Sequence, residues 1–254
     1  VNLTVGVVTT SINYDEYVDA IIQSGVKIVE TAGRSPAPFM QRFKQAGIKV
    51  IHKCVAVRHA LAAERLGVDV VSIDGFECAG HPGDKDVGGL VLFPAAARAL
   101  SIPVVASGGL ADGQGLVAAL ALGCDGVNMG TRFLATKEAP IHSGIKDKIV
   151  EMNENQTQVI FRAFNNTVRV YRNSVSERVA EVEAARGTYD ENRDLVSRAK
   201  QEIAWPTGEI EAGMISAGLS GALIDDTPSC EDLVANIVRE AEDIIRHRLA
   251  DCVA

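Results

Sequence analysis

Residues 68–83 read VDVVSIDGFECAGHPG, a buried apolar run that leads straight into a loop rich in glycine. The run Val68–Ile73 consists of valine and isoleucine except for Asp69 and Ser72, which is typical of a buried strand of a parallel sheet. The loop from Asp74 to Gly83 carries three glycines, one proline, Cys78 and His81. Because loops that follow such strands lie at the surface and carry function, this loop is a candidate site.

Outward from this stretch, short β-branched runs alternate with longer amphipathic ones up to about residue 135, which predicts βα units and a parallel sheet. The predicted strands are Val1–Val5, Lys27–Thr31, Lys49–Lys53, Asp69–Asp74, Val104–Ser107 and Gly126–Met129. The predicted helices are residues 14–24, 36–46, 57–66, 90–100 and 112–122, several of them ended by glycine. Such a repeat suits either a barrel or a doubly wound sheet.

The number of predicted strands bears on closure of the sheet. A closed TIM (β/α)8 barrel needs eight strands, and about six βα units are counted in residues 1–135. An open sheet would leave two unpaired edges, which proteins usually pair or cover. We therefore expect an α/β fold of the TIM (β/α)8-barrel type whose first two βα units are absent from this sequence.

Residues 136–254 are charged and polar, and they predict a C-terminal helical segment packed on the barrel as a lid or arm. One helix is expected over Arg178–Arg186, before Gly187, and a final one over 229–249, with Ser229 and Asp232 as a capping box. Its apolar stripe is Leu233, Val234, Ile237, Val238, Ala241, Ile244 and Ile245.

Composition limits the partners. The chain has 254 residues and a net charge of −8, which argues against nucleic acid because that binding needs clustered basic residues. No apolar run reaches the ~20 residues of a membrane helix. Five cysteines without a C-x-x-C pair indicate a reducing, cytoplasmic location, where the glycosylation sequon at Asn165–Thr167 is accidental.

Glycine-bearing ends of the last two strands indicate an anion site. Ser107-Gly108-Gly109 follows one strand, and Gly130-Thr131 follows the next. Glycines let backbone N–H groups approach a phosphate closely, and a following helix would direct its positive end at the anion. The sequence therefore predicts a bound phosphate monoester.

Three further side chains fall at the same edge of the sheet. Lys53 ends its strand, and a buried ammonium there needs an anion or an electron-rich ring. Asp74 is expected either to pair with the ammonium of Lys53 as the opposite charge or to cap the following turn. His81, held between Gly80 and Pro82, suits general acid–base chemistry. The histidines show no spacing for zinc ligands, so no metal is expected.

Four motifs resemble the nitronate monooxygenase family, formerly 2-nitropropane dioxygenases. They are Ile51-His-Lys-Cys54, Asp74-Gly-Phe-Glu-Cys-Ala-Gly-His-Pro-Gly83, Ala106-Ser-Gly-Gly109 and Asn128-Met-Gly-Thr-Arg-Phe133. The resemblance continues through Ser216-Ala-Gly218 and Leu223-Ile-Asp-Asp226, and so covers essentially the whole chain. It implies an FMN-dependent TIM barrel that oxidises alkyl nitronates or nitroalkanes with O2 to carbonyl compounds and nitrite.

The resemblance also implies a role for each site residue. His81 faces the substrate, abstracting the α-proton of a neutral nitroalkane or donating a hydrogen bond to the nitro group. Lys53 sits against the flavin ring. The residues that border the flavin are Asp74, Ala79 and Gly80, and those that hold its phosphate are Ser107, Gly108, Gly109, Gly130 and Thr131.

Alternatives remain open. The family also includes FMN-dependent NADH:quinone reductases with the same loop, for which NADH and a quinone would be partners. Their loop after the first strand seen here bears proline, whereas Gly6–Ser11 has none. Flavin-dependent enoyl-acyl carrier protein reductases are a third relative. Outside flavin chemistry, Cys78 could serve a purine-nucleotide dehydrogenase-like barrel as nucleophile, or the barrel could bind a phosphate ligand without catalysis. The sequence leaves a homodimer open.

Overall fold

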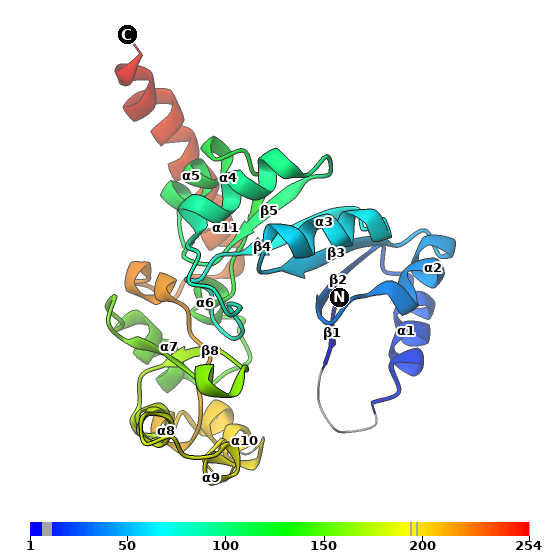
Figure 1. Ribbon diagram of the computed structural model, residues 1–254. Helices are drawn as coiled ribbons and strands as arrows, with labels where there is room; N and C mark the ends of the chain where they lie inside the picture. The colour runs from blue at the N-terminus through cyan, green and yellow to red at the C-terminus, as the bar shows by residue number, and fades with distance from the viewer. Residues whose placement is uncertain (7–11, 194, 197, 254) are drawn as a thin grey trace.

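The computed structural model describes residues 1–6, 12–193, 195–196 and 198–253, and its first half is one parallel sheet (Figure 1). The strands are β1 (Asn2–Val5), β2 (Ile28–Gly33), β3 (Lys49–Cys54), β4 (Val70–Asp74), β5 (Val104–Ser107) and β6 (Gly126–Asn128). The helices between them are α1 (Tyr14–Gln23), α2 (Ala37–Gln45), α3 (Val57–Leu66), α4 (Gly89–Ala99) and α5 (Gly113–Ala121). The predicted strands and helices of this half are confirmed.

The strand order distinguishes the two folds that the spacing allowed. The strands lie side by side in chain order, from β1 to β6, and every neighbouring pair is parallel. A doubly wound sheet reverses its strand order at a switch point, whereas a (β/α) barrel does not. The arrangement is therefore of the barrel type, with β1 and β6 as the edge strands of the described sheet.

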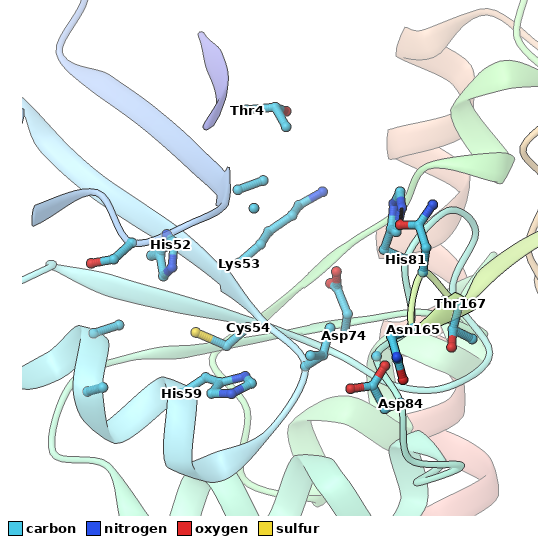
Figure 2. Close-up of a pocket in the computed structure, with 18 of the residues that line it drawn as sticks. Thr4, His52, Lys53, Cys54, His59, Asp74, His81, Asp84, Asn165 and Thr167 are labelled. Carbon is cyan, nitrogen blue, oxygen red and sulfur yellow. Dashed lines mark hydrogen bonds between the residues drawn. The ribbon is translucent and has the colours of Figure 1, made fainter. Parts of the chain in front are cut away.

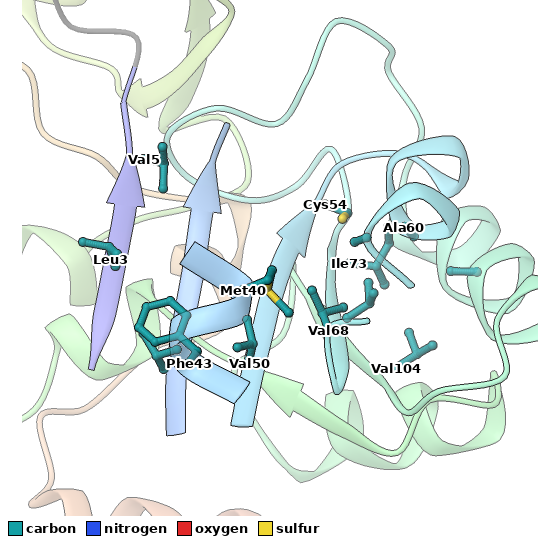
Figure 3. Close-up of a cluster of buried hydrophobic side chains, with 14 of the residues drawn as sticks. Leu3, Val5, Met40, Phe43, Val50, Cys54, Ala60, Val68, Ile73 and Val104 are labelled. Carbon is teal, nitrogen blue, oxygen red and sulfur yellow. The ribbon is translucent and has the colours of Figure 1, made fainter. Parts of the chain in front are cut away.

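The helices cover one face of the sheet because alternate strand residues are apolar. In β3, Val50 and Cys54 are buried in a cluster that also contains Met40 and Phe43 of α2 (Figure 3). Successive side chains of a strand point to opposite faces, so Lys53 lies on the other face. That second face carries the polar residues of the candidate site.

The second half contains a β-hairpin that the sequence did not predict. The hairpin pairs β7 (Thr157–Ile160) with β8 (Val168–Tyr171) in antiparallel register. Around it lie α6 (Thr131–Leu134), α7 (Ser143–Val150), α8 (Ser174–Ala184), α9 (Tyr189–Asn192) and α10 (Arg198–Thr207). Helix α8 begins four residues before the expected Arg178 because Asn173 caps it, with Ser176 completing the capping box.

The final helix, α11 (Cys230–Asp243), packs against α5 and continues as a π-helical stretch, Ile244–Leu249. Ser229 caps it, as predicted, by accepting a hydrogen bond from the backbone N–H of Asp232. The apolar stripe divides: Leu233, Ile237 and Ala241 are buried, whereas Val234, Val238 and Ile245 are about half exposed. The chain end projects away from the molecule, opposite α8, α9 and α10 (Figure 1).

Within the described residues, no helix has both the length and the apolar composition to cross a membrane.

Candidate functional site

The carboxyl ends of the strands bring the predicted polar residues together. Lys53 lies beside Ser72 in the sheet register, and Asp74 lies beside Ser107, which in turn lies beside Asn128. Strand alternation turns these side chains to the face that the helices do not cover. The residues after β3, β4, β5 and β6 therefore meet at one rim, as expected for parallel strands.

Two cavities open at this rim, and they share part of their walls. The larger, of about 620 Å³, includes His81 among its lining residues, and Lys53 and Asp74 point into it (Figure 2). The smaller, of about 90 Å³, is lined by Ser107, Gly108, Gly109, Gly130 and Thr131, among others. Lys53, Asp74 and Ala79 line both. The rim thus offers two adjacent cavities, one lined by the histidine and the other by the glycine corners, which share a wall.

Of the predicted site residues, Gly80 is the one that lines neither cavity. Its backbone instead forms a bridge with Arg169 of β8, in which Arg169 N–H donates to Gly80 O (2.7 Å) and Gly80 N–H donates to Arg169 O (3.1 Å). Gly80 therefore anchors the loop that carries His81.

The glycines differ in what they require. Gly108 has φ +92°, and a Cβ there would lie 2.9 Å from Cys78 N and 3.0 Å from Gly75 O. Only glycine fits such a left-handed, crowded position without strain. Gly130 has φ −97°, which any residue adopts, and a Cβ there would meet nothing within 4 Å. The space beside Gly130 is consequently open to a ligand.

Arg169 fixes the loop after β4. Its buried guanidinium donates hydrogen bonds to Phe76 O at 3.0 and 3.2 Å and to Thr157 Oγ1 at 3.0 Å. It also lies over the Phe76 ring, 4.8 Å from the centroid. Sequence reasoning missed Arg169, because its partners lie far away along the chain.

The C-terminal half also completes the smaller cavity. Thr131 Oγ1 accepts a hydrogen bond from Gly218 N–H at 2.9 Å, and Ser220 joins the lining. Leu219 N–H donates to Glu77 O at 3.0 Å, which ties the same segment to the His81 loop. The one sequence signal for these contacts was the Ser216-Ala-Gly218 motif. Helix α6, behind Gly130, has four residues, so backbone and hydroxyl donors dominate this corner rather than a macrodipole.

The Lys53 ion pair differs from the expected one. Lys53 Nζ lies 3.6 Å from Glu30 Oε1 of β2, and Glu30 also accepts a hydrogen bond from Asn128 Nδ2 at 2.9 Å. The expected pairing of Lys53 with Asp74 is wrong, because Glu30 lies on the neighbouring strand at the same face and reaches the ammonium first. Lys53 still acts on Asp74 through its charge.

Asp74 is a buried acid of the rim with a shifted pKa. Burial raises its pKa above the usual value, against the opposing effects of the Lys53 charge and the Ser107 hydroxyl. Its Oδ1 atom is buried and has no hydrogen-bond partner among the described residues. An unpaired buried carboxyl oxygen is costly, which makes this atom a candidate contact for a bound ligand.

His81 stands at the mouth of the larger cavity with an exposed side chain. Its Nε2 lies 3.1 Å from Asn166 Oδ1, on the turn between β7 and β8. Asn165, Asn166 and Thr167 all line the same cavity. Sequence reasoning had set this tripeptide aside as an accidental sequon, and the local pattern gave no sign that the turn reaches His81.

Cys78 does not suit the role of a nucleophile. Its side chain is buried, and burial raises the pKa of its thiol to about 12. A reactive cysteine needs an exposed thiolate in an electropositive setting. No group of three or more His, Cys, Asp or Glu side chains able to hold a metal occurs in the described part of the chain.

Known proteins similar to this chain include members of one family. A family model described as nitronate monooxygenase matches residues 2–240. A probable nitronate monooxygenase of Staphylococcus aureus is 30% identical over 91% of this chain and 67% of that protein. The (3aS,4S,5R,7aS)-5-hydroxy-7a-methyl-1-oxo-octahydro-1H-indene-4-carboxyl-CoA dehydrogenase of Mycobacterium tuberculosis is 30% identical over 88% of this chain and 74% of that protein.

Solved structures agree on the fold. FabK from Thermotoga maritima superposes with a TM-score of 0.89 at 30% identity, over 98% of this chain and 77% of FabK. A nitroalkane oxidase from Streptomyces ansochromogenes, at 24% identity and a TM-score of 0.75 over 91% of this chain and 68% of that one, shares the fold. The expected TIM-barrel type of fold and the family resemblance are confirmed.

The raised pKa of Asp74 predicts how stability depends on pH. From about pH 4, the ordinary value of an unfolded aspartate, up to the raised pKa of the folded state, the unfolded chain has released a proton that the folded protein keeps. The free energy of unfolding therefore falls as pH rises through this window, by about 1.4 kcal/mol for each pH unit that the window spans. Asp74→Asn removes this pH-dependent loss of stability. The Tm of the variant should therefore rise relative to the Tm of the wild type as pH increases.

Thermal unfolding of flavin-free protein between about pH 4 and about pH 7 measures this difference. Glu154→Gln, which alters an exposed carboxylate, is the matched control and should show a Tm difference that does not grow with pH. A flat Tm difference for Asp74→Asn would contradict the burial of an ionisable Asp74.

Proposed function

Because the chain belongs to the nitronate monooxygenase family and is therefore an oxidoreductase, we propose that it uses FMN to oxidise alkyl nitronates and nitroalkanes with O2. The products would be a carbonyl compound and nitrite. The observation that carries the proposal is the pair of adjacent cavities at the strand ends, which share a wall, with His81 lining one and the glycine corners lining the other.

The residues present fit FMN. The smaller cavity combines backbone N–H groups at Gly108, Gly109 and Gly130 with the hydroxyls of Ser107 and Thr131, a donor set that suits a phosphate monoester. Thr131 Oγ1 accepts from Gly218, which leaves its own hydroxyl hydrogen available to donate to the phosphate.

The shared wall fits the ring system. Lys53, Asp74 and Ala79 border both cavities, so a ring held by its phosphate would lie against them. The unpaired Oδ1 of Asp74 and the ammonium of Lys53 are then the polar groups that meet the ring edge. Gly80 acts behind this wall, because it holds the loop through its bridge to Arg169.

Bound FMN would supply the electron acceptor and the route to O2. The chain's own contribution is proton transfer and orientation. His81 would take the α-proton of a neutral nitroalkane, which leaves the nitronate anion in the cavity. For a substrate that arrives as the nitronate, the same imidazole would donate a hydrogen bond to a nitro oxygen and hold the anion in place.

The quinone reductase alternative remains because the family resemblance of the Gly80–Gly83 loop extends to it. Its distinguishing loop, after β1, falls largely on residues 7–11, outside the described residues. The similarity to FabK and to the CoA-ester dehydrogenase supports a second alternative, in which the substrate is a larger acyl thioester. The enoyl-acyl carrier protein reductase alternative belongs to this group. The buried Cys78, with its raised pKa, argues against the cysteine-nucleophile alternative.

The assignment of residues 1–135 as the FMN-binding barrel portion and 136–254 as a lid or arm is also part of the proposal. It is supported by Asn166, Gly218 and Ser220, which bring the second segment to the rim of the first. A cytoplasmic location and a homodimer are proposals as well, and the first of these follows from the odd number of cysteines.

Gly130→Val tests the phosphate corner. The backbone at Gly130 has an ordinary φ and open space beside it, so valine should fold normally while filling the volume that the phosphate needs. We expect the purified variant to lose FMN, measured as the ratio of flavin to protein absorbance. Gly126→Val, at a glycine of β6 that also has open space beside it, is the control and should keep its flavin. A full complement of FMN in Gly130→Val would contradict the assignment.

His81→Asn tests the general base. We expect turnover of neutral nitroethane to fall by roughly 10²-fold or more, because the imidazole is the group placed to take the proton, while FMN stays bound. Turnover of preformed nitronate should fall less. His247→Asn, at a histidine in the π-helical stretch far along the chain, should leave both rates unchanged. Wild-type turnover of nitroethane by His81→Asn would remove His81 from this role.

Anaerobic reduction of the flavin separates the nitronate and NADH alternatives. Mixed with propyl nitronate, the wild-type enzyme should lose its flavin absorbance rapidly, and mixed with NADH it should lose it slowly. Stopped-flow absorbance at the flavin bands measures both. Fast bleaching by NADH with no response to the nitronate would select the quinone reductase instead.

A further inference from the structure

The turn between β7 and β8 holds Asn166 in a defined position. Phe161 and Asn165 adopt left-handed backbone conformations, with φ of 61° and 53°, which non-glycine residues rarely adopt. The Glu183 carboxylate of α8 accepts hydrogen bonds from Phe161 N–H and Ala163 N–H, and Asn166 N–H donates to Phe161 O at 3.1 Å. The strained turn is thus held in place from a neighbouring helix.

The same hairpin fixes the position of His81. The Gly80–Arg169 bridge lies one residue before His81 and three residues after Asn166. The positions of His81 and Asn166 therefore both depend on the two backbone hydrogen bonds between Gly80 and Arg169. Because of this shared anchor, the 3.1 Å contact between His81 Nε2 and Asn166 Oδ1 follows from the backbone arrangement of the two segments.

The chemistry of this contact determines which imidazole nitrogen carries the proton. A carboxamide oxygen can only accept a hydrogen bond. A neutral imidazole has one N–H, so donation from Nε2 to Asn166 Oδ1 leaves Nδ1 with its lone pair. Among the described residues, His81 Nδ1 has no hydrogen-bond partner, whereas Nε2 has Asn166.

We infer that Asn166 is a positioning residue that holds His81 in the Nε2–H tautomer, so that Nδ1 is the nitrogen that takes the substrate proton. The inference rests on the proposed role of His81 as base. Asn166 itself touches no reacting atom and acts through the imidazole. The charged groups that line the same cavity, Lys53, Asp74 and Asp84, are left unchanged by substitution at Asn166.

Nitrogen NMR of the ¹⁵N-labelled, flavin-loaded wild type tests the tautomer without any assay of activity. Signals of the five histidines are sorted by the loss of the His81 signals in His81→Asn. We expect His81 Nε2 to resonate as a protonated nitrogen and Nδ1 as an unprotonated one. In Asn166→Leu, which keeps the shape at an exposed position but removes the acceptor, the two nitrogens should move toward an averaged pattern.

A wild-type His81 protonated at Nδ1, or a pattern in Asn166→Leu identical to that of the wild type, would overturn the inference. Neither outcome depends on which substrate the enzyme uses. A failure of the proposed function, seen as absent nitroalkane turnover, is therefore distinguishable from a failure of this inference.

Steady-state kinetics of Asn166 variants provide a second test of the inference. Asn166→Leu should lower kcat for neutral nitroethane by about 10- to 100-fold with KM nearly unchanged, as expected when a base loses its orientation. Asn166→Asp keeps an acceptor and so should restore the tautomer. Its carboxylate also stabilises the imidazolium, so the acid limb of its pH–rate profile should move to higher pH by roughly one unit or more.

Asn155→Leu, at an exposed asparagine before β7 that bonds Glu154, is the matched control and should match the wild type in every measurement. An Asn166→Asp variant with an unshifted acid limb, or an Asn166→Leu variant with wild-type kcat, would argue against positioning by Asn166.

Discussion

The buried guanidinium of Arg169 is the contact on which the rim of this barrel depends. Burying a charged group is costly unless its N–H donors form hydrogen bonds. Here the Phe76 carbonyl and the Thr157 hydroxyl accept hydrogen bonds from the guanidinium, and the Phe76 ring lies against it. The backbone of the same residue pairs with Gly80. One residue of β8 thereby holds the loop after β4 at two points, Phe76 and Gly80, and the second of these lies directly before His81.

Much of the sheet was predictable because its determinants are local. Each strand is a short β-branched run, each helix has an apolar stripe, and a glycine such as Gly67 ends the helix in a left-handed conformation. Once parallel strands are assumed, the residues that follow them must share one edge. That rule alone brought Lys53, Asp74, Ser107 and Thr131 to a common rim.

The parts that escaped prediction depend on contacts between distant segments. Strands β7 and β8 lie in a charged and polar region without the βα alternation that marked the first six strands, so their short runs gave no clear signal. Glu30 replaced Asp74 as the partner of Lys53 because strand neighbours at one face compete, and the sequence does not show which carboxylate is nearer. Asn166 and Ser220 reach the cavities from segments whose local sequences resemble ordinary loops.

The long separation of these contacts has a consequence for the order of assembly. Arg169 lies 93 residues beyond Phe76, and Gly218 lies 87 residues beyond Thr131. A nascent chain that has emerged from the ribosome only as far as β6 holds the six strands of the described sheet, yet it lacks Arg169, Gly218 and Ser220, which complete the anchoring of the loop and the wall of the smaller cavity. We therefore expect the sheet to form during translation and the binding space to mature afterwards, so that any ligand meets a scaffold that has already folded.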